Sequence, residues 1–212
     1  MIIRKVAIGV LLVLSIVVFS KNCLAVQLLT QEQALEKMFP EAEEIVTETR
    51  VLTSTETARI KERLGGSLVH YQKGSKSEEV EEKVKYTFYF GLKDNQKTGV
   101  AVIEEQPGKW GPVKFIIALD TATAKVKNLA VMSYKEKRGR PIARRNFLKQ
   151  FVGKSSEDSI KVRKDIRAIS GATISSDATC FAVKKVIVLY EELFLKKETE
   201  GEACGWEKEE TD

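Results

Sequence analysis

The chain has 212 residues, 43% of them hydrophobic and 31% charged, and its formal net charge is +5 at pH 7. This length is enough for one compact domain with a real hydrophobic core, and the sequence has no internal repeat that would indicate a solenoid. The three cysteines show no C-x-x-C or Cys/His spacing, which excludes the usual zinc, haem and iron–sulfur sites, so no protein-bound metal is expected.

The first 25 residues have the layout of a secretory signal. Arg4 and Lys5 give a basic start, an apolar run of 14 residues follows from Val6 to Phe19, and Ala25 is a small residue at a suitable cleavage position. The run is shorter than the about 18 to 20 residues of a membrane-spanning helix, which favours a cleaved signal; a retained membrane anchor is the alternative. We therefore expect residues 1–25 to be a signal peptide or membrane anchor, and the protein to be exported to the periplasm or the outer face of the cytoplasmic membrane.

Charge is unevenly distributed over the rest of the chain. Residues 135–149 contain seven cations and one carboxylate, whereas residues 196–212 contain seven carboxylates and three lysines and are expected to form a disordered acidic tail. A basic patch on an exported protein meets phosphate groups, lipid headgroups or acidic partners. Nucleic acid is not expected as a partner, because the patch lacks interleaved aromatic residues for base stacking.

Two helices with the same N-terminal signal are predicted early in the chain. Thr30 and Gln33 have capping-box spacing, and so do Thr53 and Glu56. The first helix should end before a proline, and the second at the glycine pair that begins at Gly65.

Hydrophobic patterning predicts an α+β fold, an antiparallel sheet with packed helices, because strands and helices do not alternate regularly. The expected strands are residues 44–52, 67–71, 84–92, 99–104, 113–120 and 125–134. The expected later helices are residues 144–151 and an amphipathic helix from about 176 to 195. We divide the chain into a lead-in at 26–83, a main domain at 84–195 and the tail.

The segment from Ser170 to Ser176, with the sequence SGATISS, has the residue types of a phosphate cradle. Gly171 permits a tight turn, Ala172 adds little bulk, and the following residues open a helix whose N–H groups and dipole favour an anion. The hydroxyls of Ser170, Thr173, Ser175 and Ser176 can each donate to a phosphate oxygen. An ordinary strand–turn–helix joint with a serine cap is the alternative.

Several separated motifs in the same order resemble the FMN-binding domain family. They are residues 99–101 (GVA), 111–113 (GPV) leading to Asp120, 131–139 ending in EKRG, 147–154 and 170–173 (SGAT). The resemblance extends over about residues 84–192, and residues 30–64 are similar to the helical lead-in of such proteins. The chain resembles the periplasmic flavin-carrying domains of this family, which include the G subunit of the Rnf-type electron transport complex and the C subunit of the sodium-pumping NADH:quinone oxidoreductase.

The resemblance implies FMN as the cofactor and Thr173 as the residue linked to its phosphate. Thr173 would then be the attachment point of a phosphoester made by a flavin transferase, and the alternative is that Thr173 only caps the helix. The remaining residues implied at the cofactor are Ser170, Gly171, Ala172, Ile174, Ser175 and Ser176 from the cradle, Glu136, Arg138 and Gly139 from the loop beside the flavin, and Tyr134 as a stacking ring. The same loop can also be read as a charged hairpin turn.

One position departs from the family pattern. An acidic residue usually lies three positions before the first Ser or Thr of the motif, and here that position is Arg167. If the transferase needs this carboxylate, FMN would bind reversibly and Arg167 would pair with the phosphate instead.

We expect an electron-transfer flavoprotein rather than a substrate-converting enzyme, carrying electrons between the membrane and extracytoplasmic redox partners. The alternatives are a reductase of a small acceptor with reversibly bound FMN, and an anion-binding module without flavin. His70, the only histidine, is expected to be a surface residue with no carboxylate beside it, not a catalytic base. Cys180 and Cys204 can form a disulfide, but a buried thiol and a separate one is the preferred interpretation.

Overall fold

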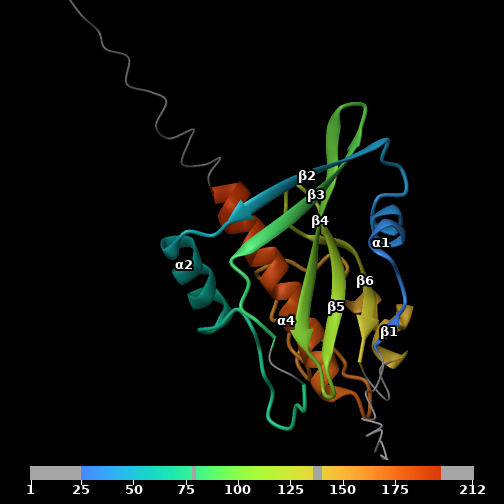
Figure 1. The fold of residues 1–212 in the computed structure, drawn as a ribbon, viewed down its shortest axis with the longest axis vertical. Helices are drawn as coiled ribbons and strands as arrows, with labels where there is room; N and C mark the ends of the chain where they lie inside the picture. Colours follow the sequence, from blue (N-terminus) through green and yellow to red (C-terminus); the bar gives the residue numbers. More distant parts are fainter. Residues whose placement is uncertain (1–24, 78–79, 136–139, 197–212) are drawn as a thin grey trace, which may run out of the picture.

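The computed structural model describes residues 25–77, 80–135 and 140–196, and its architecture is the predicted α+β class (Figure 1). Six antiparallel strands form one sheet in the order β1-β6-β5-β4-β3-β2. The strands are β1 Val26–Gln27, β2 Glu44–Val51, β3 Lys85–Lys93, β4 Gln96–Pro107, β5 Pro112–Leu119 and β6 Val126–Tyr134. The helices are α1 Gln31–Met38, α2 Ser54–Leu64, α3 Arg145–Leu148 and α4 Thr173–Tyr190, with 3₁₀ turns at Arg140–Ala143 and Lys149–Phe151 and a π turn at Glu191–Leu195.

The two predicted capping boxes are both present. Thr30 caps α1 with reciprocal hydrogen bonds to Gln33, and Thr53 caps α2 in the same way with Glu56. Gly65 ends α2 in the left-handed region at φ 86°, a conformation that glycine adopts without a Cβ penalty. These local signals therefore position the helices that follow β1 and β2.

The sheet has a hydrophobic core on each face, because successive side chains of a strand point to opposite sides. Phe115 and Ile117 of β5 contribute to the larger core under α4 and α2, whereas Ile116 faces α1. Figure 1 shows α4 and α2 on one side of the strands and α1 on the other. The strand run that the sequence marks as continuously apolar is therefore covered on both faces.

The expected strand at residues 67–71 is wrong. Leu68 and Val69 are buried, as their apolar character suggests, but the segment is irregular. The side chain of Gln106 satisfies its backbone instead, donating to Leu68 O at 3.2 Å and accepting from His70 N at 3.1 Å. The segment therefore joins no strand of the sheet, and β2, paired with β3, forms this edge.

Helix α4 is buried on nearly all sides, so the expectation that this helix is amphipathic is also wrong. It begins at Thr173, three residues earlier than predicted, and most of its residues, including Lys185, lie out of contact with solvent. Lys185 Nζ lies 2.9 Å from Glu104 Oε1 of β4, and Gln106 Nε2 donates to the same oxygen at 2.8 Å. This buried ion pair joins the helix to the centre of the sheet.

Within the described ranges, no helix combines the length and apolar character needed to cross a bilayer. The predicted signal segment up to residue 24 and the predicted acidic tail from residue 197 lie outside the residues that the structure describes.

Lys185→Met should destabilise the fold strongly, because it leaves Glu104 buried without its cation. We expect a loss of about 3–5 kcal/mol in the free energy of unfolding, measured by urea denaturation. The double variant Glu104→Gln/Lys185→Met should regain most of that loss, since neither buried charge remains. Lys184→Met, at a half-buried neighbouring position, is the matched control. A double variant as unstable as the single one would contradict this account of the ion pair.

Candidate functional site

The start of α4 is a turn followed by a helix that lacks a side-chain cap. Gly171 has φ 77°, in the left-handed region, and Ala172 occupies the N-cap position, where it makes no side-chain hydrogen bond. The N–H of Ala172 itself is used, since it donates to Ile169 O at 3.0 Å. Thr173 is the first helical residue and is exposed. An α-helix leaves its first N–H groups without intrahelical acceptors, so this end favours an anion.

The structure separates the hydroxyls that the sequence groups together. Ser170 and Thr173 are exposed, whereas Ser175 and Ser176 are 1% and 0% exposed. Ser176 Oγ donates to Ala172 O at 2.9 Å and accepts from Ile169 N at 3.2 Å, so its side chain stabilises the turn from inside. The expectation that Ser176 donates to a ligand is therefore wrong, because positions 175 and 176 face the core once the helix begins at Thr173.

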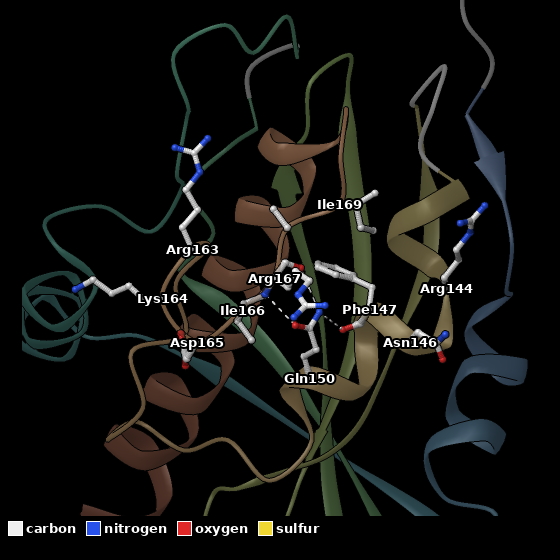
Figure 2. Close-up of a pocket in the computed structure, with 11 residues that line it drawn as sticks. Arg144, Asn146, Phe147, Gln150, Arg163, Lys164, Asp165, Ile166, Arg167 and Ile169 are labelled. Carbon is white, nitrogen blue, oxygen red and sulfur yellow. Dashed lines mark hydrogen bonds between the residues drawn. The ribbon is translucent and has the colours of Figure 1, made fainter.

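A cavity of about 800 Å³ lies beside this helix start, between α3 and the loop at residues 163–169 (Figure 2). Its lining is rich in cations and contains one carboxylate. The lining residues are Arg144, Asn146, Phe147, Gln150, Arg163, Lys164, Asp165, Ile166, Arg167, Ala168 and Ile169. Figure 2 shows Arg167 and Gln150 between Arg163 on one side and Arg144 on the other. Ser170 directly follows Ile169 in sequence, so the cavity adjoins the predicted phosphate cradle.

The side chain of Gln150 fixes the width of this cavity. Its Oε1 accepts from Arg167 N at 2.8 Å, and its Nε2 donates to Arg167 O at 3.2 Å and to Phe147 O at 3.3 Å. One amide thus joins the loop at residues 163–169 to the helical segment on the opposite wall. This contact could not be predicted from sequence, because its two sides lie 17 residues apart in an irregular region.

Asp165 holds the base of the same loop. It accepts hydrogen bonds from Ile160 N at 2.9 Å and Lys161 N at 2.8 Å, and its Oδ2 lies 3.0 Å from Lys154 Nζ. Burial raises the pKa of Asp165, but the hydrogen bonds from Lys161, Lys154 and Ile160 outweigh that effect and lower the pKa below its ordinary value. Ile160 and Arg163 have φ of 41° and 67°, strained values that this bonding pattern supports.

The other predicted residues either are at least partly buried or lie outside the described ranges. Tyr134 is 3% exposed and belongs to the core under α4, which leaves little ring surface for stacking. Ile174 is half-buried. Glu136, Arg138 and Gly139 lie outside the described residues.

Sequence reasoning missed a histidine–carboxylate pair next to the helix start. His70 Nε2 lies 3.1 Å from Asp177 Oδ2, and its ring stacks on Phe181 with centroids 5.1 Å apart. The expectation that no carboxylate lies beside His70 is therefore wrong. Asp177 follows Thr173 by four residues, so both occupy one face of α4. The partners are 107 residues apart, which no motif spacing reveals.

Cys180 is buried, as expected, and burial raises the pKa of its thiol to about 12. Its predicted alternative partner, Cys204, lies outside the described residues. Among the residues with described positions, no group of three His, Cys, Asp or Glu side chains is arranged to hold a metal ion.

Residues 108–188 match the family model described as FMN-binding domain. This range contains the cavity and the first turns of α4, and the match agrees with the resemblance and with FMN as the cofactor that it implied. Among solved structures, NqrC from Shewanella oneidensis is similar at 13% sequence identity, with a TM-score of 0.49, over 78% of this chain and 88% of that chain. No curated protein sequence matches.

Asp165→Asn should reduce the dependence of stability on acid pH. Because the folded-state pKa of Asp165 lies below its ordinary value of 3.8, its stabilisation is complete above that value and is lost as pH falls through the lower folded-state pKa. The variant should therefore be less stable than the wild type at neutral pH, and this difference in the free energy of unfolding should disappear at acid pH. Urea midpoints across this pH range measure it, with the exposed Glu157→Gln as control. A gap that stays constant with pH would count against this role.

Proposed function

We propose that this protein is an exported flavoprotein that carries electrons between a membrane donor and an extracytoplasmic redox partner, with FMN held at the start of α4 and in the adjoining cavity. The observation that carries the proposal is that the FMN-binding family match includes an uncapped, exposed helix start and a basic cavity beside it. When bound, FMN supplies a ring system that accepts and releases electrons. The residues around it need only bind, orient and tune it.

The residues present fit the chemical parts of this cofactor. The N-terminus of α4 has the first-turn N–H groups and the positive end of the helix dipole, and both stabilise a bound phosphate. Arg163 and Arg167 add positive charge in the adjoining wall, and guanidinium groups suit phosphate oxygens. Phe147 and Ile166 provide buried apolar surface, and the cavity volume falls within the range of cofactor sites.

The position of Thr173 supports covalent attachment through the phosphate. Its hydroxyl belongs to an exposed residue at the first position of the helix, where a flavin transferase can reach it. A phosphoester there keeps a negative charge beside the helix dipole, which stabilises the product. The tether also prevents loss of a diffusible cofactor outside the cell.

The composition of the cavity favours electron transfer over substrate conversion. Its lining contains no histidine, cysteine, serine or threonine, and its one carboxylate, Asp165, is occupied by the loop backbone and Lys154. The His70–Asp177 pair lies beside the helix start and is not part of this lining. General acid–base or nucleophilic catalysis needs such a group within reach of a substrate. A carrier that exchanges electrons with a docked partner needs none, and the surrounding cations suit an acidic partner surface.

Thr173→Ala should abolish covalent flavin. Intact mass of the wild type, produced in cells that contain a flavin transferase, should exceed the polypeptide mass by one FMN less one water, and the variant should show no increase. Ser170→Ala is the matched control, since it removes an exposed hydroxyl of the same turn and should keep the increase. An unmodified wild type in these cells would remove the covalent link but not FMN binding, which visible absorbance after adding FMN measures separately.

Reversible FMN binding is the second candidate function. It is favoured by Arg167, which occupies the position where the family pattern has an acidic residue and which lines the cavity. If the natural arginine at this position limits the transferase, the variant Arg167→Asp should increase the fraction of chains with covalent flavin several-fold. Arg163→Asp changes charge by the same amount in the same wall and should give no increase. An unchanged modified fraction in Arg167→Asp would show that the acidic residue is not required.

A further inference from the structure

The turn between β4 and β5 carries an indole ring surrounded by lysines. Lys76 Nζ lies 4.9 Å and Lys109 Nζ 5.4 Å from the centroid of the Trp110 ring. Lys135 lies against the same turn, where a Cβ added to Gly111 would come within 2.6 Å of Lys135 Cβ. We refer to Trp110, Lys76, Lys109 and Lys135 as the Trp110 cluster.

Backbone and short side-chain contacts hold this cluster together. Lys76 N donates to Lys109 O at 2.6 Å, which places the segment around Lys76 against the turn. Ser75 Oγ donates to Gly108 O at 2.6 Å, and Gly108 N donates to Gly111 O at 2.9 Å to close the turn. These hydrogen bonds therefore join the segment that carries Lys76 to the turn that carries Lys109 and Trp110.

The cluster lies at the end of the sheet where the N-terminal segment joins it. Pro107 pairs with Pro112, and the adjacent Val113 pairs with Tyr134, which in turn pairs with Val26 of β1. The start of α4 is at this end as well, and Gly74 lies close to Ile174 there. Figure 1 shows the β4–β5 turn, the beginning of α4 and β1 together at the lower end of the molecule.

We propose that the Trp110 cluster is a contact site for an anionic lipid bilayer, with the lysines at headgroup phosphates and the indole at the interface. Tryptophan prefers this interface because its ring is apolar and its N–H is polar, and lysines close to an anionic surface are attracted to it. The neighbouring cation–π contacts let the lysines stay beside the ring while the ring meets the headgroup layer.

The sequence around the cluster favours a bilayer over an acidic protein. Residue 25 joins β1 at this end, and the apolar run at residues 6–19 is only a few residues away along the chain. An acidic protein would be attracted by the lysines, but it would gain nothing from that proximity to an apolar segment. The inference rests on the exported location in the proposed function, and it directs the flavin site toward the membrane surface. It does not depend on FMN being bound.

The full chain can be tested in a Trp206→Phe background, which leaves Trp110 as the one tryptophan. The protein is mixed with vesicles of phosphatidylcholine, with or without phosphatidylglycerol, whose acyl chains are brominated or not. Bromine quenches indoles that reach the bilayer. We expect emission from brominated vesicles to fall to about half of that from unbrominated ones when phosphatidylglycerol is present, and salt to weaken this quenching.

Lys76→Gln/Lys109→Gln should remove most of the quenching, although the chain still floats with the vesicles if its N-terminal segment is retained. The matched control is Lys93→Gln/Lys97→Gln, at the β3–β4 turn on the opposite end of the sheet. Urea unfolding of each variant checks that the fold is kept. Equal quenching with phosphatidylcholine alone, or no quenching while the chain floats with the vesicles, would overturn the proposal. Thr173→Ala should leave the quenching unchanged, so failure of flavin attachment is recognised separately.

Discussion

The buried ion pair between Lys185 and Glu104 is the constraint on which the geometry of the site depends. An almost fully buried helix could slide along an apolar sheet surface at little cost, but a buried lysine must keep its carboxylate partner. The pair therefore fixes the position of α4 along β4. Since Thr173 is part of the same rigid helix, its distance from the sheet and from the cavity beside α3 is fixed as well.

Local signals in the sequence predicted much of this fold. The capping boxes of Thr30 and Thr53 depend on residues three positions apart, and the strands of the meander follow from β-branched and aromatic runs. The prediction failed where tertiary contacts decide. Leu68 and Val69 look like a strand, but the side chain of Gln106 takes the place of a neighbouring strand. The continuous burial of α4 could not be inferred from a pattern that contains two lysines.

In the candidate site, too, the features set by local sequence were predictable and those set by tertiary contacts were not. Gly171 and Thr173 were identifiable because a turn and a helix start are encoded in adjacent residues. The cavity was not, because Gln150 and Asp165 build it through bonds to backbone groups of irregular segments. Ser176 was assigned to the ligand on residue type alone, and the actual start of the helix turns its hydroxyl inward.

An alanine at the N-cap of α4 has a consequence for maturation. Many helices satisfy a first-turn N–H with a side-chain oxygen of the N-cap residue, but Ala172 has no such oxygen, so a bound anion would take that role here. Whatever anion settles there adds its binding free energy to local order, so loading with cofactor and the final tightening of this corner are one thermodynamic event.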